Sequence, residues 1–302
     1  MASTLSPRPR GATRPPVPVG WLVVVALLVA TGITTMSMAR TGGETGSVEA
    51  GIVPPAGDLP PIAAAAYVVV DGDTGEALAT FNADQPRPVG SLTKLMTARL
   101  VLDAGDLDRT ATVPTLDLTS DQSQAGLVPG DEVSRGVLLE AMLVASANDA
   151  ARTLAVDVAG SERRFVDMMN AEAAASDLDA TRYTSAEGLD DPDQHSSAAD
   201  VARLAHDLMG DPEFRRIVAA ETTNVPGRRP DGVSLPTTNN LLGTYSGADG
   251  VKTGHTDQAG WCLAASATRD GRTVIAVVLG APTEASRDDG ARALLDFGFA
   301  TP

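Results

Sequence analysis

The sequence predicts an α+β domain in which one antiparallel sheet is built from both ends of the domain and helices are inserted between its strands. Three observations support this prediction. Two β-like runs flank the turn signal DGDTG at 71–75, apolar residues then recur mostly at helical spacing to about residue 220, and β-like runs return beyond residue 230. We therefore expect a site where the helical insertion meets the sheet.

The first half of the domain gives a hairpin and then a series of helices. Residues 65–82, AAYVVVDGDTGEALATFN, predict the hairpin. Apolar residues at 92, 95, 96, 100 and 101 predict a helix that begins just after Ser91. Four more helices, each opening on a residue suited to capping, are expected over 134–145, 148–159, 161–175 and 197–209.

The second half returns to strands and closes with a helix. Residues 249–256, DGVKTGHT, predict a strand, and residues 259–281 predict a hairpin of two apolar strands around RDGR. Residues 285–299, ASRDDGARALLDFGF, then show helical spacing. These elements complete the sheet that the first hairpin begins.

Residues 1–39 are expected to form a cytoplasmic tail with a transmembrane anchor or a signal peptide. The 21 residues from 19 to 39 carry no charge, and arginines 8, 10 and 14 precede them. At 1.5 Å per residue such a helix spans roughly 31 Å, enough for a bilayer core. Ser37-Met38-Ala39 also fits a cleavage site, which would give a secreted protein. Either way we expect an extracytoplasmic domain, membrane-anchored or released after Ala39.

The remainder divides into a linker over 40–61, rich in Gly and Pro, and one domain over 62–302. Beyond residue 39 there are 20 basic and 39 acidic residues, a balance that argues against a nucleic-acid partner. The single cysteine, Cys262, excludes an internal disulfide and is expected to be a buried small hydrophobe.

Lysine is rare in this chain: only Lys94 and Lys252 are lysines, and the other 21 basic residues are arginines. Arginine stays protonated in proteins, whereas a lysine whose pKa is lowered can act as a base. Codon bias accounts for most of the arginines, but both lysines fall inside short patterns that suggest chemistry.

The first pattern is Ser91-x-x-Lys94 at the predicted start of a helix, where the amine can reach the serine oxygen. For Lys94 to act as a base its pKa must fall by about three units, through burial or a second cation such as Lys252. Taken alone, the pattern fits a capped helix with an exposed lysine equally well.

Two further patterns follow in order. Ser146-Ala147-Asn148 lies between two predicted helices, and by itself it fits a helix cap. Lys252-Thr253-Gly254 lies on a predicted late strand, and by itself it fits an edge strand followed by a turn. The three patterns together, in this order, resemble the signature set of penicillin-binding proteins and serine β-lactamases.

The resemblance extends over roughly residues 62–299 and is closest to the low-molecular-mass D-alanyl-D-alanine carboxypeptidases, peptidase family S11. It implies the serine β-lactamase and DD-peptidase fold. It also implies roles for the motif residues: nucleophile Ser91, base Lys94, proton relay Ser146, peptide-backbone binding by Asn148, carboxylate binding by Lys252 and Thr253, close approach of the strand at Gly254, and an oxyanion hole from the backbone N–H groups of Ser91 and His255.

The reaction that the resemblance implies is removal of the terminal D-alanine from peptidoglycan stem peptides ending in D-Ala-D-Ala, through an acyl-enzyme on Ser91. β-Lactam antibiotics would acylate the same serine. No metal or other cofactor is expected, because His195, His206 and His255 form no ligand pattern.

Two alternatives remain at this point. A serine β-lactamase of class A adds a glutamate in a Glu-x-x-Leu-Asn pattern, which does not occur between Ser146 and Lys252. A non-catalytic, membrane-tethered binding protein with the same fold is the other alternative, although none of the motif residues is missing.

Overall fold

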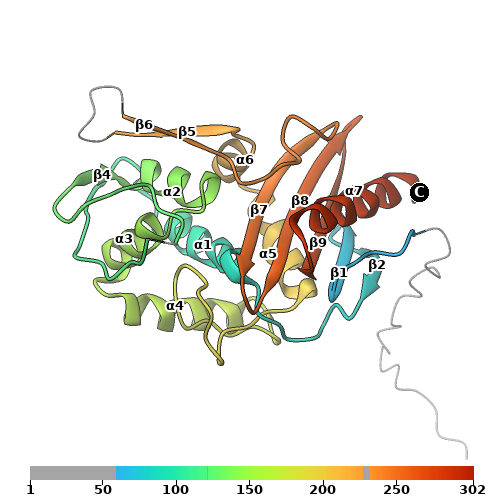
Figure 1. Ribbon diagram of the computed structural model, residues 1–302, viewed down its shortest axis with the longest axis horizontal. Coiled ribbons are helices and arrows are strands. Elements are labelled where there is room, and N and C mark those ends of the chain that lie inside the picture. Colours follow the sequence, from blue (N-terminus) through green and yellow to red (C-terminus); the bar gives the residue numbers. More distant parts are fainter. Residues whose placement is uncertain (1–58, 121, 227–231) are drawn as a thin grey trace, which may run out of the picture. The chain divides into compact units, whose positions relative to one another are not determined.

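The computed structural model describes residues 59–120, 122–226 and 232–302, and a five-stranded antiparallel sheet organises this part of the chain (Figure 1). Its strand order is β2-β1-β9-β8-β7. The bounds are Ala66–Asp71 for β1, Ala77–Phe81 for β2, Ala248–Thr256 for β7, Gly260–Arg269 for β8 and Arg272–Ala281 for β9. Strand β1 pairs with β9, so the predicted sheet from both ends of the domain is confirmed.

Helices cover both faces of the sheet (Figure 1). Helix α7 (Glu284–Ala300) packs on β9 and β8, and helix α5 (Ala198–Met209) packs on β9 and β1. The middle of β8 and of β9 is buried on every residue, as expected for strands covered on both sides. This explains why the 259–281 segment has a nearly continuous apolar run rather than an alternating one.

The remaining helices form the insertion beside the sheet. They are the short 3-10 helix η1 (Gly90–Thr93), α1 (Lys94–Ala104), α2 (Arg135–Val144), α3 (Asn148–Ala159), α4 (Glu162–Ala175) and α6 (Pro212–Val218). The side chains of Ser134, Ser161 and Ser197 cap α2, α4 and α5 as the sequence predicts. Helix α3 differs, because it has no side-chain cap and its first residue, Asn148, uses its side chain elsewhere.

Two small hairpins are present that the sequence did not predict. Strands β3 (Thr110–Thr112) and β4 (Glu132–Ser134) form one, and β5 (Thr222–Val225) and β6 (Val233–Pro236) form the other. Strands of three or four residues are too short to show a period of two, so their pairing depends on tertiary contacts.

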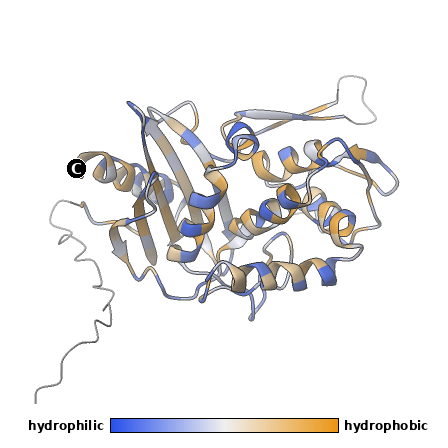
Figure 2. Cartoon of the chain, turned by 180° about the vertical axis from the view of Figure 1, so that it is seen from behind, coloured by the Kyte–Doolittle hydropathy of each residue, from blue (hydrophilic) through white to orange (hydrophobic). Residues whose placement is uncertain are grey.

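The core consists of two apolar clusters on the two faces of the sheet. The cluster on the α7 face includes Leu263, Val274 and Leu294, and the larger one on the other face extends into the helical insertion (Figure 2). Cys262 is free and buried in this larger cluster, and burial raises the pKa of its thiol to about 11, in keeping with the predicted apolar role.

The predictions for residues 1–39, and for most of the 40–61 linker, fall outside the described residues. From residue 59 onward, apart from 121 and 227–231, no helix combines the length and the apolar character that crossing a bilayer requires.

Candidate active site

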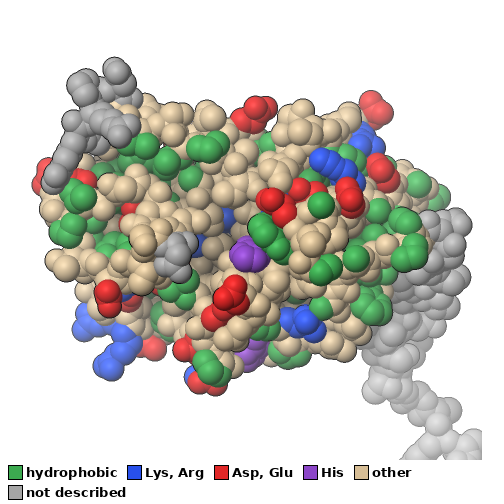
Figure 3. Space-filling view, in the orientation of Figure 1, with side chains coloured by type: hydrophobic (Ala, Val, Ile, Leu, Met, Phe, Trp, Pro, Cys, Tyr) green, Lys and Arg blue, Asp and Glu red, His purple; other side chains and the backbone are tan. Residues whose placement is uncertain are grey.

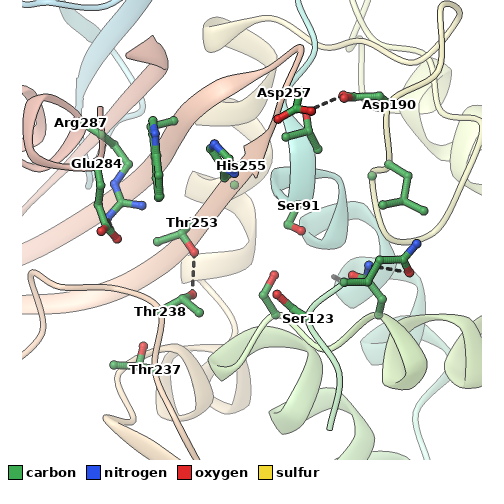
Figure 4. Close-up of a pocket in the computed structure, with 18 of the residues that line it drawn as sticks. Ser91, Ser123, Asp190, Thr237, Thr238, Thr253, His255, Asp257, Glu284 and Arg287 are labelled. Atoms are coloured by element: carbon green, nitrogen blue, oxygen red, sulfur yellow. Dashed lines mark hydrogen bonds and ion pairs between the residues drawn. The ribbon is translucent and has the colours of Figure 1, made fainter. Parts of the chain in front are cut away.

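A cleft of about 750 Å³ opens where the helical insertion meets the sheet, as the sequence predicted. Its walls come from η1, from the turn before α3, from strand β7 and from the first turn of α7 (Figure 4). On this face of the molecule, acidic side chains and a histidine gather around the hollow (Figure 3). The predicted motif residues Ser91, Ser146, Asn148, Thr253, Gly254 and His255 all line the cleft.

Lys94 lies directly behind Ser91. Helix α1 begins at Lys94, one turn after Ser91 in η1, and the Nζ of Lys94 is 2.7 Å from the Oγ of Ser91. The lysine side chain is fully buried, so the alternative of a capped helix with an exposed lysine is wrong. An amine at hydrogen-bond distance from a cleft-lining hydroxyl is the arrangement that activates a serine nucleophile.

Three acceptors surround the Nζ of Lys94. Besides Ser91, the Oδ1 of Asn148 lies at 2.7 Å and the carbonyl oxygen of Glu187 at 2.8 Å. A charged ammonium donates to all three. A neutral amine has two N–H groups and one lone pair, so it can donate to Asn148 and Glu187 and accept the proton of Ser91. The site therefore fits both protonation states without rearrangement.

Burial lowers the pKa of Lys94 to about 7. The carboxylates of Glu187 and Asp149 act in the opposite direction and raise it. The sequence anticipated a fall of this size through burial and a second cation such as Lys252. Burial is the largest influence on the pKa of Lys94, and the charges of Lys94 and Lys252 also repel each other. The amine is thereby brought into the range where it can exchange a proton near neutral pH.

The turn between α2 and α3 places Ser146 and Asn148 in the cleft. Ser146 has a φ of 60°, a left-handed conformation that reverses the chain directly after α2. Asn148 then begins α3 and donates its backbone N–H to the carbonyl of Ser123. Its neighbour Asp149 accepts from the backbone N–H groups of Ala125 and Leu127, which ties the segment next to the cleft-lining Gln122 and Ser123 to α3.

Lys252 and Thr253 form the wall contributed by the sheet. The Lys252 side chain is 1% exposed, and its Nζ donates to the carbonyl of Thr253 at 3.0 Å. Burial, and then the charges of Lys94 and Arg287, hold the pKa of Lys252 well below its usual range. The hydroxyls of Thr253 and Thr238 are 2.6 Å apart (Figure 4).

Gly254 allows strand β7 to approach η1. A Cβ at this position would lie 2.5 Å from the carbonyl oxygen of Val89 and 3.2 Å from the backbone nitrogen of Ser91. Only glycine fits this approach. The contact brings the backbone of Ser91 close to that of Gly254 and His255, where the oxyanion hole is predicted; that role stays a prediction.

A second cation lies at the far end of the sheet wall. The ring of His255 lies 4.1 Å from that of Trp261, and the guanidinium of Arg287 lies 5.5 Å from the same indole (Figure 4). Arg287 is 2% exposed and is held by Asp288 at 2.6 Å and Glu284 at 3.3 Å. A buried guanidinium in a cleft can bind an anionic group of a ligand.

Sequence reasoning missed three residues of this site: Glu187, Thr238 and Arg287. Arg287 carried a usable signal, because 287, 291 and 294 share the apolar helical spacing that places a residue on the buried face of α7. Glu187 and Thr238 lie outside helices and strands, and no local pattern marks them. Among the residues that the structure describes, no three or more His, Cys, Asp or Glu side chains are grouped to hold a metal ion.

Comparison with known proteins decides the family. The family model described as D-alanyl-D-alanine carboxypeptidase, peptidase S11, matches residues 54–283. The chain belongs to this family. Curated relatives include the D-alanyl-D-alanine carboxypeptidases DacD of Escherichia coli, 37% identical over 252 residues, and DacF of Bacillus subtilis, 34% identical over 237 residues. These alignments cover 79% and 77% of this chain but only 64% and 61% of the relatives' own length.

Two solved structures have the same fold. The Streptomyces K15 DD-transpeptidase matches with a TM-score of 0.76 and 32% identity, over 80% of this chain and 99% of that one. Penicillin-binding protein 6B of Escherichia coli matches with a TM-score of 0.74 and 36% identity, over 82% and 80% of the two chains. The predicted DD-peptidase fold, with its α+β architecture, is therefore confirmed.

Proposed function

We propose that this protein is a serine D-Ala-D-Ala carboxypeptidase that removes the terminal D-alanine from peptidoglycan stem peptides and is acylated by β-lactam antibiotics. The observation that carries the proposal is the fully buried Lys94 amine 2.7 Å from the cleft-lining Ser91 hydroxyl. Membership of the carboxypeptidase family supports the same reaction. No bound metal or organic cofactor enters the steps below.

Acylation begins when the Oγ of Ser91 attacks the carbonyl carbon of the penultimate D-alanine. The hydroxyl proton passes to the Nζ of Lys94, whose lone pair faces Ser91 when the amine is neutral. The negative charge that develops on the substrate oxygen is stabilised by the backbone N–H groups of Ser91 and His255. The C–N bond then breaks, and Ser146 relays the proton from the Lys94 ammonium to the nitrogen of the departing D-alanine, which leaves Lys94 neutral again.

The sheet wall recognises the free carboxylate that defines an exopeptidase substrate. Thr253 faces the cleft with its hydroxyl, Lys252 lies behind it, and Arg287 adds a second cation. Asn148 binds the backbone of the stem peptide from the helical wall. An internal peptide bond has no carboxylate at this place, so the site selects chain ends.

Deacylation restores the enzyme. A water attacks the ester carbonyl on Ser91, gives a proton to neutral Lys94, and the ester C–O bond breaks with return of that proton to the serine oxygen. The products are the shortened peptide and free enzyme. Between Ser146 and Lys252 the sequence has no Glu-x-x-Leu-Asn pattern that would supply a glutamate to activate this water, and we therefore expect slow release of penicillin.

We also propose that the domain acts outside the cytoplasm, attached to the membrane by residues 19–39 or released by cleavage after Ala39. The uncharged run of 21 residues and the three preceding arginines support this placement. Intact-mass measurement of the protein recovered from cell fractions tests it. A membrane-bound full-length chain or a secreted chain starting at residue 40 agrees, and a full-length cytosolic chain contradicts it.

Two measurements test the activity. Mass spectrometry after incubation with penicillin should locate a long-lived adduct on Ser91, and a synthetic peptide ending in D-Ala-D-Ala should release D-alanine. Ser91→Ala should abolish both. Rapid turnover of penicillin would instead identify a β-lactamase, and peptide binding without D-alanine release would identify a non-catalytic binding protein.

A further inference from the structure

Glu187 is a buried carboxyl group beside the reactive lysine, and the mechanism above gives its side chain no role. It lies between α4 and α5, is 5% exposed, and its carbonyl oxygen accepts from Lys94. Its Oε2 is buried without a hydrogen-bond partner among the described residues. A carboxyl group in such a place destabilises the fold relative to an apolar side chain, so its presence calls for a reason.

The segment that carries Glu187 is fixed against η1. The next residue, Gly188, has a φ of 90°, and a Cβ there would clash with the carbonyl oxygen of Gly90. Its backbone N–H donates to the hydroxyl of Ser185 at 3.0 Å. The backbone that carries Glu187 therefore cannot move away from Lys94 without displacing η1, which carries Ser91.

The charges that act on Glu187 come from three helices. Lys94 on α1 and Arg152 on α3 favour its ionised form, and Glu162 on α4, which pairs with Arg152 at 2.9 Å, opposes it. Burial is the largest influence and raises the pKa of Glu187. The charges that act on Lys94 are those of Glu187 and, on α3, Asp149, which favour its charged form, and that of Lys252 on β7, which opposes it. Glu187 and Lys94 thus stabilise each other's charged forms in a site where burial favours neutral ones.

This relation bears directly on acylation, since only neutral Lys94 can accept the proton of Ser91. A negative charge on Glu187 makes Lys94 hold its proton more tightly, which moves the onset of activity to higher pH. We propose that Glu187 is a positioning residue that governs how readily Lys94 releases its proton and thereby sets the pH at which acylation of Ser91 begins. The inference rests on the proposed function, in which Lys94 is the base.

The test is the pH dependence of the acylation rate constant, measured with a fluorescent penicillin on the wild-type protein and on Glu187→Gln. Glutamine keeps the size of the side chain and removes the charge. We expect the acid limb of the profile to move down by about one pH unit, with the plateau rate within about twofold of wild type.

Two controls separate charge from structure. Glu76→Gln makes the same charge change on the exposed turn between β1 and β2, and should leave the profile unmoved. Glu187→Asp keeps the charge and shortens the side chain, and should hold the acid limb near its wild-type position. Glu187→Ser, neutral and smaller, replaces the glutamine variant if that variant does not fold, and should shift the limb in the same direction.

The outcomes are distinct. The inference is overturned if Glu187→Gln folds and is acylated but its acid limb does not move. It is also overturned if the Asp and Gln variants shift the limb equally, because the shape of the side chain rather than its charge would then be responsible. If the wild-type protein forms no adduct on Ser91 at any pH, the proposed function itself is wrong, a result that no Glu187 variant can produce.

Discussion

Lys94 on the helical wall and Lys252 on the sheet wall are almost equally buried, at 0% and 1% exposure. The two amines repel each other, but their other neighbours carry opposite charges. Lys94 lies near the carboxylates of Glu187 and Asp149, which partly offset the effect of burial on its pKa. Lys252 lies near the cations Lys94 and Arg287, which add to that effect. The same amine is therefore placed in two different electrostatic settings within one cleft.

The difference shows how the two walls divide the chemistry. The helical wall gives its lysine three acceptors and nearby acids, so that it can hold and release a proton near pH 7. The sheet wall brings the cations Lys252 and Arg287 together. Among the described residues, the Nζ of Lys252 has a single hydrogen-bond acceptor, the carbonyl of Thr253. The carboxylates of Glu284 and Asp288 pair with Arg287, so an anionic ligand would supply the counter-charge for Lys252.

The largest effect is expected from replacing Lys94 by arginine. Arginine keeps the charge but cannot act as a base, so acylation should fall by roughly 10³-fold at every pH. The rate of adduct formation with a fluorescent penicillin measures this. Lys252→Arg, the matched change on the sheet wall, keeps the cation there and should lose only about tenfold through overpacking. Equal losses in both variants would contradict the division between the walls.

Removing the charge of Lys252 comes next. Lys252→Met keeps most of the side-chain volume but takes a cation from the carboxylate end of the cleft, and KM for a D-Ala-D-Ala peptide should rise roughly 10²-fold with a smaller change in kcat. The wild-type protein should also prefer penicillin over its carboxyl methyl ester, and the variant should lose this preference. If the variant still prefers penicillin over its methyl ester, the carboxylate of the ligand binds elsewhere in the cleft.

A smaller effect is expected where the two walls touch. In Gly254→Ala the new methyl group would lie 2.5 Å from the Val89 carbonyl, so β7 and η1 must separate. We expect about 2 kcal/mol lower stability and roughly tenfold slower acylation. Thermal unfolding and adduct kinetics measure these. Gly271→Ala, at a turn with open space around it, should cost about 1 kcal/mol without slowing acylation.

The smallest effect should come from Thr238→Val, which removes the hydroxyl 2.6 Å from that of Thr253. One neutral hydrogen bond contributes about 1 kcal/mol, so KM should rise roughly fivefold. Steady-state release of D-alanine gives this value. Thr238→Ser keeps the hydroxyl and should have the KM of the wild-type protein. If the serine variant is as impaired as the valine variant, the rise in KM comes from altered packing and not from the lost hydrogen bond.

Much of this site was predictable because the key residues sit in short patterns with a chemical meaning. Ser91-x-x-Lys94 placed the hydroxyl and amine one turn apart, and the 2.7 Å distance agrees with that. The tuning residues were not predictable in the same way. Glu187 lies 93 positions from Lys94 in the chain, and only the folded loop brings its backbone carbonyl onto the Nζ of Lys94 and its carboxylate near that amine. Burial of Lys94 itself also depends on tertiary packing, which local spacing does not report.

The fold was likewise predictable only in part. Long elements such as α4, α5, β8 and β9 were visible in apolar spacing or turn signals, whereas the three-residue strands β3 and β4 were not. Asn148 illustrates how function overrides a local rule. Its type and position suit a helix cap, but its side chain accepts a hydrogen bond from Lys94 instead, and α3 begins without a side-chain cap.

The place of β9 between β1 and β8 has a consequence for biogenesis. During synthesis β1 leaves the ribosome about two hundred residues before the strand on which it must pair, and closing so long a loop is slow. A nascent chain that ends before residue 272 has Ser91 and Lys94 but lacks the strand that joins β1 to β8. We therefore expect the proposed acylation by β-lactams only after β9 has been synthesised, and we expect prematurely terminated fragments to bind no penicillin.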